Sequence, residues 1–488
     1  MASSSALQPH TASLSGETPG AAGGVTVNES WAALSPPPQG DWTPAALGDA
    51  QGLSLGATAT SPGALELVGT ITQALVDQEA GTRGNRRGTA GRASLTRAVG
   101  AIVGGVLAAW AGKRARAVFR SGVRASFTGG LVGNRQFVAV VGGLQALGML
   151  SHAAGRRFRI DWGDDFSQHG LAARYRPTGA LLDTAQAHGV VPPTIATDFL
   201  ASFPTKPPVV GALVVLRALH DRWGGHRKRS GPAAKRDMTI LPGDPVARRL
   251  RAEVETFNAF AAAHVVTGCL PPRWRRIFAL DWSHGGRWYA AGNDGPYQTL
   301  GAAARLTMTI GGAPVVEIDA RASHLTIMHG LFGLSAPEGD PYAIEGLEGE
   351  RETVKEWIKT TLGKGTPATQ WARNAPPAVR ERDARMVGAA ILSRYPFLSD
   401  PSQATAWSGS VGERRRHLTH RLANVEATAL TVAMTLLREQ GVLALPMHDG
   451  LIVPAIAEDM AKAAMVAGYV EAAGVVPSLT VERPSLPV

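Results

Sequence analysis

Two aspartates stand where metal-dependent chemistry could take place. Asp319 follows an apolar run at 315–318 and precedes a helical pattern over 322–331. Asp449 occupies a short polar tip inside the otherwise apolar segment 442–453, a pattern typical of a β-hairpin. Taken singly, each aspartate has an ordinary explanation, because aspartate also caps helices and forms turns. Taken together, the two carboxylates could converge and hold two Mg²⁺ or Mn²⁺ ions for in-line phosphoryl transfer.

Three cations lie between these aspartates in the sequence. Arg351, Lys355 and Lys359 are spaced by four residues, so on a helix they share one face. A cationic helix face opposite a carboxylate metal site is what a triphosphate substrate requires. Glu352 and Glu356 are interleaved with the cations, so a solvated face of mixed charge is the alternative explanation. The helix alone does not decide between the two.

Composition restricts the class of protein that carries these residues. The chain has 488 residues, with 49 Lys and Arg against 39 Asp and Glu, a net charge of +10. This surplus favours a polyanionic partner. The single cysteine, Cys269, excludes an internal disulfide, and no Cys/His cluster has zinc-site spacing. The start of the chain lacks a signal-peptide pattern, and the apolar run 99–111 is shorter than the roughly 20 residues of a membrane span. We therefore expect a soluble, cytoplasmic protein with no membrane partner.

The organisation along the chain indicates a tail, a basic region, a linker and a C-terminal domain. Residues 1–60 are rich in Ser, Gly, Pro, Ala and Thr, which predicts a disordered tail. Residues 61–225 are basic and mostly helical in pattern, with a helix expected over 212–223. Residues 226–245 form a basic linker rich in Gly and Pro. The remainder, 246–488, contains the aspartates and the cationic helix.

Within the basic region, one stretch has an order similar to that of a winged helix. An amphipathic helix ending near Gly148 is followed by a strand pattern at 156–162, a polar loop, and a second strand pattern at 172–176. Arginines lie on both predicted strands, and winged helices use such arginines on phosphates. A small α+β packing module with solvated arginines is an equally good interpretation of this stretch.

The order of the motifs resembles that of family A DNA polymerases and the related single-subunit, phage-type RNA polymerases. Residues 316–330 resemble motif A, 351–363 resemble motif B, and 445–454 resemble motif C. Gly286-Arg287, Gln298 and Arg305 upstream of Asp319, and Asn424–Ala429 before motif C, agree with this order. The resemblance covers about 276–482. It implies an α+β fold, with a palm of antiparallel sheet and helices after a mostly helical, winged-helix-like basic region.

The resemblance also implies roles for individual residues. Asp319 and Asp449 would be the catalytic metal ligands, and Arg351 and Lys355 would neutralise the triphosphate. Arg287 and His448 would position the primer end. Some positions depart from the family pattern; among them, His324 stands at the sugar-gate position, Lys359 replaces an aromatic residue, and Gly450 follows the motif C aspartate. The departure at His324 leaves open whether dNTPs or rNTPs are preferred.

The expected function is therefore DNA-directed DNA polymerisation, in which a primer 3′-hydroxyl attacks the α-phosphate of an incoming nucleoside triphosphate and pyrophosphate is released. The expected partners are a DNA primer-template and nucleoside triphosphates, and the expected cofactor is Mg²⁺ or Mn²⁺. Two alternatives stay open. One is a non-catalytic DNA-binding protein of replication or of a mobile element, with a degenerate palm. The other is an RNA polymerase or primase-like enzyme.

Overall fold

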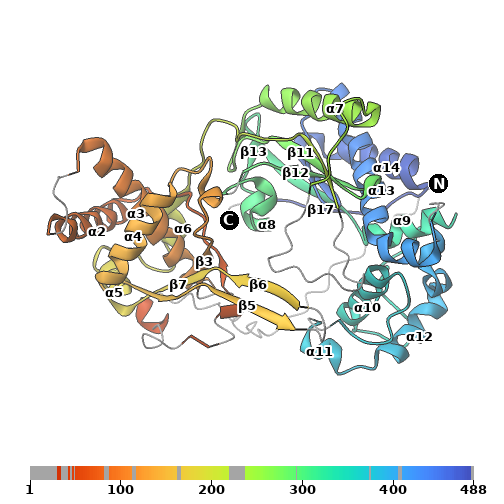
Figure 1. Ribbon diagram of the computed structural model, residues 1–488, viewed down its shortest axis with the longest axis horizontal. Helices are drawn as coiled ribbons and strands as arrows, with labels where there is room; N and C mark the ends of the chain where they lie inside the picture. The colour runs from red at the N-terminus through yellow and green to blue at the C-terminus, as the bar shows by residue number, and fades with distance from the viewer. Residues whose placement is uncertain are drawn as a thin grey trace, which may run out of the picture.

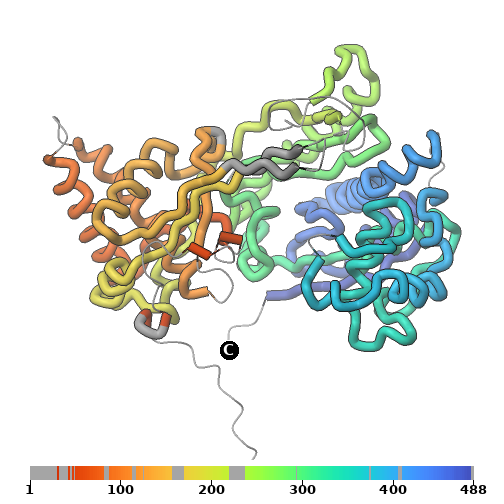
Figure 2. Tube along the Cα trace, turned by 60° about the horizontal axis from the view of Figure 1, so that its bottom comes forward, coloured from red at the N-terminus to blue at the C-terminus, as the bar shows by residue number. Residues whose placement is uncertain are grey.

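The chain forms two lobes, each with its own hydrophobic core (Figure 1). A computed structural model describes residues 30–34, 42–43, 47–48, 50–81, 87–112, 117–161, 166–218, 237–292, 294–372, 375–404 and 409–484. The N-terminal core runs from Trp31 to Phe199, and the C-terminal core runs from Val214 to Val475. The two lobes remain distinct in a second view (Figure 2).

The N-terminal lobe packs helices against a small sheet. Its helices are α2 (Pro62–Ala80), α3 (Thr89–Ala111), α4 (Asn134–Ala146), α5 (Gly179–Ala187) and α6 (Ile195–Asp198). Its sheet has the order β1-β3-β7-β4, with β1 (Gln51–Gly52), β3 (Val118–Arg120), β4 (Leu150–Ala153) and β7 (Ala173–Pro177). A separate pair joins β2 (Ala57–Ala59) to β8 (Phe199–Ala201). Helix α3 is central because its glycines allow close approach: a Cβ at Gly104 would lie 2.4 Å from the Phe199 ring.

Helix α3 is long and apolar enough to cross a membrane, with a mean hydropathy of 1.4. The apolar run 99–111 is thus the second half of a 23-residue helix rather than an isolated short segment. In this structure 67% of that apolar window is buried inside the protein. A buried core helix of this composition meets the same criterion, so the helix is weak support for a membrane span.

The prediction of a disordered tail over 1–60 is wrong for the described residues of its second half, several of which are buried in the N-terminal core. The indole of Trp31 is buried and donates a hydrogen bond to the Val190 carbonyl at 2.7 Å. Leu53 and Leu55 are also buried in the N-terminal core. A large apolar residue in a Gly- and Ser-rich context thus finds its partner 159 residues away in the sequence. Residues 1–29 lie outside the described residues.

The winged-helix-like stretch has the predicted helix but a different strand arrangement. Helix α4 is confirmed, and Gly148 follows it with a φ of 68°. The first predicted strand is β5 (Arg156–Asp161), and most of the predicted polar loop is a further strand, β6 (Phe166–Leu171), which pairs with β5. The second predicted strand is β7, which pairs with β3 and β4 instead. A winged-helix arrangement therefore remains a prediction.

The arginines on β7 do not have the exposed position that a wing would give them. Arg174 and Arg176 are 7% and 3% exposed. Arg174 donates to the Leu47 carbonyl at 3.2 Å and stacks on Phe119, and Arg176 stacks on Trp42. Their guanidinium groups hold the N-terminal segment against the sheet, so a phosphate-contacting role for these two arginines is wrong.

The boundary between the lobes falls earlier than the expected position at 225. The predicted helix over 212–223 is wrong in its first half, where Val214–Arg217 forms strand β9. This strand pairs in parallel with β11, and Val214 and Leu216 belong to the C-terminal core. Residues 219–236, including most of the predicted linker, lie outside the described residues.

The C-terminal lobe contains two sheets. A three-stranded sheet has the order β12-β11-β9, with β11 (Trp274–Ala279) and β12 (Asp281–Ala290). A six-stranded sheet has the order β10-β13-β14-β16-β15, and β17 also pairs with β14. Its strands are β10 (Val266–Thr267), β13 (Thr309–Ile310), β14 (Ala313–Ala320), β15 (Leu445–Met447), β16 (Gly450–Pro454) and β17 (Leu479–Glu482). Apart from the β9–β11 pair, the strand pairs of these two sheets are antiparallel, as expected for a palm.

Helices pack around these sheets. They are α7 (Pro245–Ala262), α8 (Ala302–Arg305), α9 (Ser323–Leu331), α10 (Arg351–Lys364), α11 (Pro377–Arg380), α12 (Ala384–Arg394), α13 (Val411–Glu439) and α14 (Glu458–Ala473). Helices α10, α11 and α12 gather at one end of the lobe (Figure 1). Helices α13 and α14 approach closely at Gly468, where a Cβ would lie 2.2 Å from the Ala429 carbonyl oxygen. This close contact fixes α13, which carries residues of the site described next.

Candidate functional site

Strand pairing brings the two aspartates together. Asp319 lies near the end of β14, directly opposite Gly450, the first residue of β16. Asp449 immediately precedes Gly450 in the tight turn that joins β15 to β16, and its carbonyl accepts a hydrogen bond from the Ala320 amide at 3.1 Å. Both aspartates are partly exposed. Residues that are far apart in sequence therefore share one end of the sheet.

Two residues beside these aspartates have left-handed backbone conformations. His448 has a φ of 34°, and Ala322, which precedes α9, has a φ of 49°. Among the described residues other than glycine, the third positive φ is at Leu280. Such conformations cost about 1–3 kcal/mol each and are found preferentially at functional sites. At His448 this conformation belongs to the turn that presents Asp449.

The site concentrates negative charge. Burial, followed by the carboxylates of Asp449, Glu317 and Glu482, raises the pKa of Asp319 to about 7, although Arg305 acts in the opposite direction. Burial also raises the pKa of Asp449, and the carboxylate of Glu426 adds to the effect. The raised pKa values show that two negative charges close together are unfavourable here. A divalent cation bound beside them would neutralise that charge.

The two aspartates are the carboxylates of this site that could bind Mg²⁺ or Mn²⁺ together with a substrate. Within the part of the chain that the structure describes, no group of three or more His, Cys, Asp or Glu side chains could hold a metal ion. The protein would thus supply two carboxylates. Mg²⁺ commonly takes only one or two carboxylates from a protein and completes its shell with water and substrate phosphates.

Two of the nearby acidic residues, Glu317 and Glu426, are paired with arginines. Glu317 receives two hydrogen bonds of 2.8 Å from Arg305, one of the residues expected upstream of Asp319. Glu426 of α13 pairs with Arg287 of β12, whose Nε donates to Glu426 Oε2 at 2.8 Å. Of these four carboxylates, Asp319 and Asp449 are the two that form no ion pair with an arginine of the described residues.

Arg287 and His324 form one network with Glu426. The Nη2 group of Arg287 donates to His324 Nε2 at 3.2 Å, so Nε2 carries a lone pair and the ring proton is on Nδ1. Burial, followed by the positive charge of Arg287, lowers the pKa of His324 to about 4. His324 is therefore neutral at pH 7. The network places both side chains close to Asp449, which acts on the pKa of His324.

Two further residues, which the sequence did not single out, hold Glu426 in place. The hydroxyl of Ser323 donates to Glu426 Oε1 at 2.7 Å and lies 2.9 Å from the hydroxyl of Tyr469 on α14. Glu426 is 1% exposed, and burial raises its pKa. The sequence does indicate that Glu426 is unusual, because a carboxylate among apolar helix residues needs a cationic partner. The sequence did not reveal which residue is that partner, since Arg287 lies 139 residues away.

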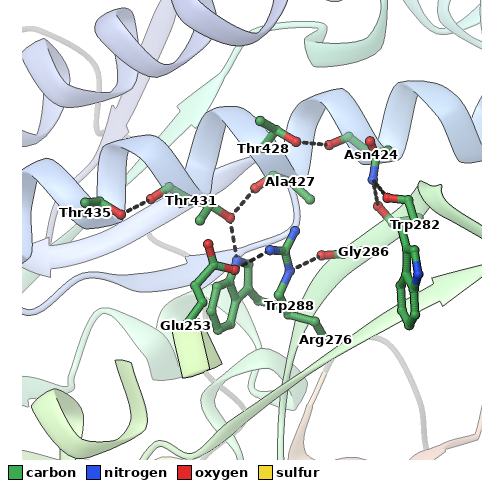
Figure 3. Close-up of polar contacts among 11 residues, drawn as sticks. Glu253, Arg276, Trp282, Gly286, Trp288, Asn424, Ala427, Thr428, Thr431 and Thr435 are labelled. Atoms are coloured by element: carbon green, nitrogen blue, oxygen red, sulfur yellow. Dashed lines mark hydrogen bonds and ion pairs between the residues drawn. The ribbon is translucent and has the colours of Figure 1, made fainter. Parts of the chain in front are cut away.

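Figure 3 shows how α13 is fixed against the strand that carries Arg287. The indole of Trp288 donates to Thr431 Oγ1 at 2.9 Å, and the Asn424 amide donates to the carbonyls of Trp282 and Gly285, each at 3.3 Å. Beside them, Arg276 donates to the Gly286 carbonyl at 2.9 Å and pairs with Glu253 of α7. The backbone at Gly286-Arg287 is thus held on both sides.

The cationic helix is where it was predicted, but its cations have acidic partners. Arg351 donates to Asp340 at 2.8 Å and stacks on Tyr342. Lys355 lies 3.7 Å from Glu352, and Lys359 lies 3.1 Å from Glu356. Burial raises the pKa of Tyr342, and Arg351 acts in the opposite direction. Both lysines have their ion pairs within α10 itself rather than with Asp319 or Asp449.

The predicted site residues thus fall into two groups. Asp319, Asp449, Arg287 and His324 interact within one cluster, and His448 is exposed in the turn next to Asp449. Arg351, Lys355 and Lys359 lie on α10, outside that cluster. Ser323, Glu426 and Tyr469 complete the cluster.

Comparisons with known proteins give a distant similarity to solved structures. No protein-family model matches the chain, and no curated protein matches it. Among solved structures, it is similar to the POL domain of Pol1 from M. smegmatis in complex with DNA primer-template and dNTP. The identity is 12% and the TM-score is 0.29, and the match covers 48% of this chain and 50% of that chain. The chain thus spans about half the length of that structure. Because this similarity is so low, we infer the function from the residues of this chain.

Proposed function

We propose that the chain is a cytoplasmic, template-directed nucleotidyltransferase, specifically a DNA polymerase that extends a DNA primer with nucleoside triphosphates. The observation that carries the proposal is the β14–β16 pairing, which gives Asp319 and Asp449 a common position at the end of an antiparallel sheet. Two carboxylates with raised pKa values beside a fixed arginine are well suited to a divalent cation and an anionic substrate.

Asp319 and Asp449 would hold Mg²⁺ or Mn²⁺, which supplies stabilisation of the negative charge on the attacking and leaving oxygens. Arg287, held by Glu426, would keep a rigid position beside the primer end, together with His448. Catalysis of this kind depends mainly on positioning and charge neutralisation, so a pre-fixed guanidinium is more useful than a mobile one.

Arg351 and Lys355 would neutralise the triphosphate, with Lys359 one turn further along α10. The ion pair of Lys355 with Glu352 is solvent-exposed, and exposed pairs contribute about 0–1 kcal/mol. Glu352 is therefore readily exchanged for phosphate oxygens. The N-terminal lobe would hold the primer-template. This role does not require a winged helix, since any basic face attracts the phosphates of DNA.

A primed-template extension assay on the full chain tests the proposal. We expect extension with Mg²⁺ or Mn²⁺, faster with dNTPs than with rNTPs, and none with the double variant Asp319→Asn/Asp449→Asn. Preference for rNTPs would identify an RNA polymerase or primase-like enzyme instead. Absence of extension with either metal and either type of nucleotide would contradict the proposal.

One observation favours the non-catalytic alternative, a DNA-binding protein with a degenerate palm. The three predicted triphosphate-binding cations, Arg351, Lys355 and Lys359, have acidic partners within 4 Å in this structure, whereas a triphosphate site needs uncompensated positive charge. The two functions differ in a simple measurement: only the polymerase shows triphosphate binding that depends on a divalent cation and on Lys355.

A further inference from the structure

The N-terminal lobe has an unusual distribution of charge. Residues 80–160 contain 14 Lys and Arg residues and no Asp or Glu. The nearest acidic residue before this segment is Glu79, which forms a two-point pair with Arg87 through bonds of 2.6 Å. The segment therefore concentrates positive charge that its own sequence does not balance.

An open recess of about 620 Å³ lies within this segment. Its lining includes Arg87, Arg124 and Arg135, together with Phe127 and Thr128, and no acidic residue lines it. Arg124 and Arg135 are exposed. Neither has a hydrogen bond or an ion pair with any residue that the structure describes. Two uncompensated guanidinium groups thus line one recess.

The backbone that carries these two arginines is firmly braced. Arg120, which is 8% exposed, donates to the Ser126 carbonyl at 2.8 Å and stacks on the ring of Phe127. Asn134 donates to the Gly122 carbonyl at 3.0 Å, and Gln136 donates to Ser94 at 2.7 Å. The turn that bears Arg124 and the first turn of α4, which bears Arg135, are therefore held together. These contacts brace the backbone on which Arg124 and Arg135 stand.

We propose that this recess binds the internal phosphates of a nucleic-acid strand through Arg124 and Arg135. Guanidinium groups match phosphate oxygens in geometry and remain charged at any physiological pH. The volume falls in the range of about 300–1,000 Å³ that accommodates an organic ligand, so a nucleotide unit of a strand fits better than a lone inorganic anion. The inference deepens the proposed function, because it assumes that the partner is nucleic acid, and it moves the contact away from the buried arginines of β7.

Equilibrium binding of the full chain to a labelled DNA duplex tests this site, with a chelator present so that polymerisation has no part in the result. We expect Arg124→Gln/Arg135→Gln to weaken binding about 10- to 100-fold at low salt and to reduce the slope of log K against log salt by about two, since each lost phosphate contact removes about 0.9. Arg124→Lys/Arg135→Lys retains the charge and should retain most of the affinity. Arg97→Gln, which changes an exposed arginine of α3 outside the recess, is the matched control.

Two results would overturn the proposal. One is a double Gln variant that is folded by circular dichroism and binds with the affinity and salt slope of the parent. The other is a loss that appears with a 5′-phosphorylated duplex but not with its 5′-hydroxyl counterpart, which would assign the recess to a terminal phosphate. Because the readout is binding, a failure here is distinct from a failure of the polymerase assay. If the parent chain extends no primer but the double Gln variant shows the predicted loss of DNA binding, the proposed phosphate site stands and only the proposed catalysis is wrong.

Discussion

Asp319 and Gly450 face each other across β14 and β16 so closely that position 450 has no room for a side chain. A Cβ added to Gly450 would lie 2.1 Å from Asp319 Oδ1 and 2.5 Å from the Ile318 carbonyl oxygen. By sequence, Gly450 is a departure from the family pattern. In this chain, the Asp319 carboxylate can lie where it does because residue 450 has no side chain.

Gly450→Ala should displace the Asp319 carboxylate. Since the neighbouring atoms are a backbone carbonyl and the metal-binding side chain, we expect a loss of about 1–3 kcal/mol in the free energy of unfolding. We also expect a fall in extension rate on the order of 100-fold, because small displacements at a catalytic centre are costly. Gly412→Ala, which has open space around its Cβ, is the matched control. Normal activity of the Gly450 variant would show that the carboxylate position is not critical.

Asp449→Asn keeps the size and turn propensity of the residue but removes a charge from the metal site. We expect a fall in extension rate of about a thousandfold or more, because several kcal/mol of transition-state stabilisation are lost. DNA affinity should change by less than about twofold, since it depends on Lys and Arg contacts to phosphates. Asp459→Asn, on the exposed first turn of α14, controls for charge. If the Asp449→Asn protein extends primers normally, Asp449 is only a turn residue.

Stability of the metal-free protein should depend on pH through Asp319. Its pKa is about 7 in the folded chain, against about 3.9 in an unfolded chain. The folded state therefore binds this proton more tightly, and the free energy of unfolding falls as pH rises from about 4 to about 7. Asp319→Asn should remove this dependence and raise stability at pH 8 by about 1–3 kcal/mol.

Chemical denaturation at pH 5 and pH 8, with a chelator, measures this effect. Asp183→Asn, on the exposed side of α5, is the control for loss of one carboxylate. Mg²⁺ added at pH 8 should raise the melting temperature of the parent more than that of the Asp319→Asn variant, because binding to the folded state stabilises it. An equal response of the two proteins would place the Mg²⁺ elsewhere.

Lys355→Ala should weaken the use of triphosphate. Lys355 is half-exposed and its pair with Glu352 is long, so it is free to exchange partners when a triphosphate arrives. We expect KM for the nucleotide to rise about tenfold, the equivalent of one lost charge-assisted contact, with little change in the affinity for primer-template. Lys364→Ala, at the end of the same helix, is the control. An unchanged KM would favour the non-catalytic alternative.

Tyr469→Phe tests the support of the buried network. The substitution removes one hydrogen bond to Ser323, which keeps its bond to Glu426. We expect a loss of about 1 kcal/mol in the free energy of unfolding and a small change in extension rate. Glu426→Gln should cost more, because Arg287 loses its charged partner. Tyr289→Phe, in β12, is the matched control. An equal effect of the two Tyr variants would show that Tyr469 does not support the network specifically.

The local patterns around the aspartates were predictable from sequence because they depend on neighbours in the chain. The apolar run before Asp319, the hairpin around Asp449 and the spacing of Arg351, Lys355 and Lys359 all correspond to elements in the structure. That Asp319 and Asp449 could converge was part of the prediction. The pairing of β14 with β16, which brings them to one end of the sheet, was not, because strand register is decided by long-range packing.

Other features depended on partners that a sequence does not reveal. Arg174 and Arg176 have the same composition signal as surface arginines, yet carbonyl and aromatic partners bury them. Trp31 lies in the stretch predicted to be a disordered tail, but its indole is buried and hydrogen-bonded to the Val190 carbonyl, a partner that the sequence does not reveal. The expected helix at the end of the basic region became β9 because β11 offered an unpaired edge.

The central position of β14 has a consequence for how the protein is made. Its neighbours β16 and β17 are synthesised much later, and Thr480, opposite Asp319, lies 161 residues further along. The N-terminal core uses only residues up to Phe199 and can fold first, as early parts of a nascent chain do. Meanwhile Val315, Val316 and Ile318 remain on the ribosome without their sheet partners, in the kind of apolar strand that aggregates when left unpaired. The aspartate site is thus among the last parts of this protein to form, and slower translation or a holding chaperone would protect it most.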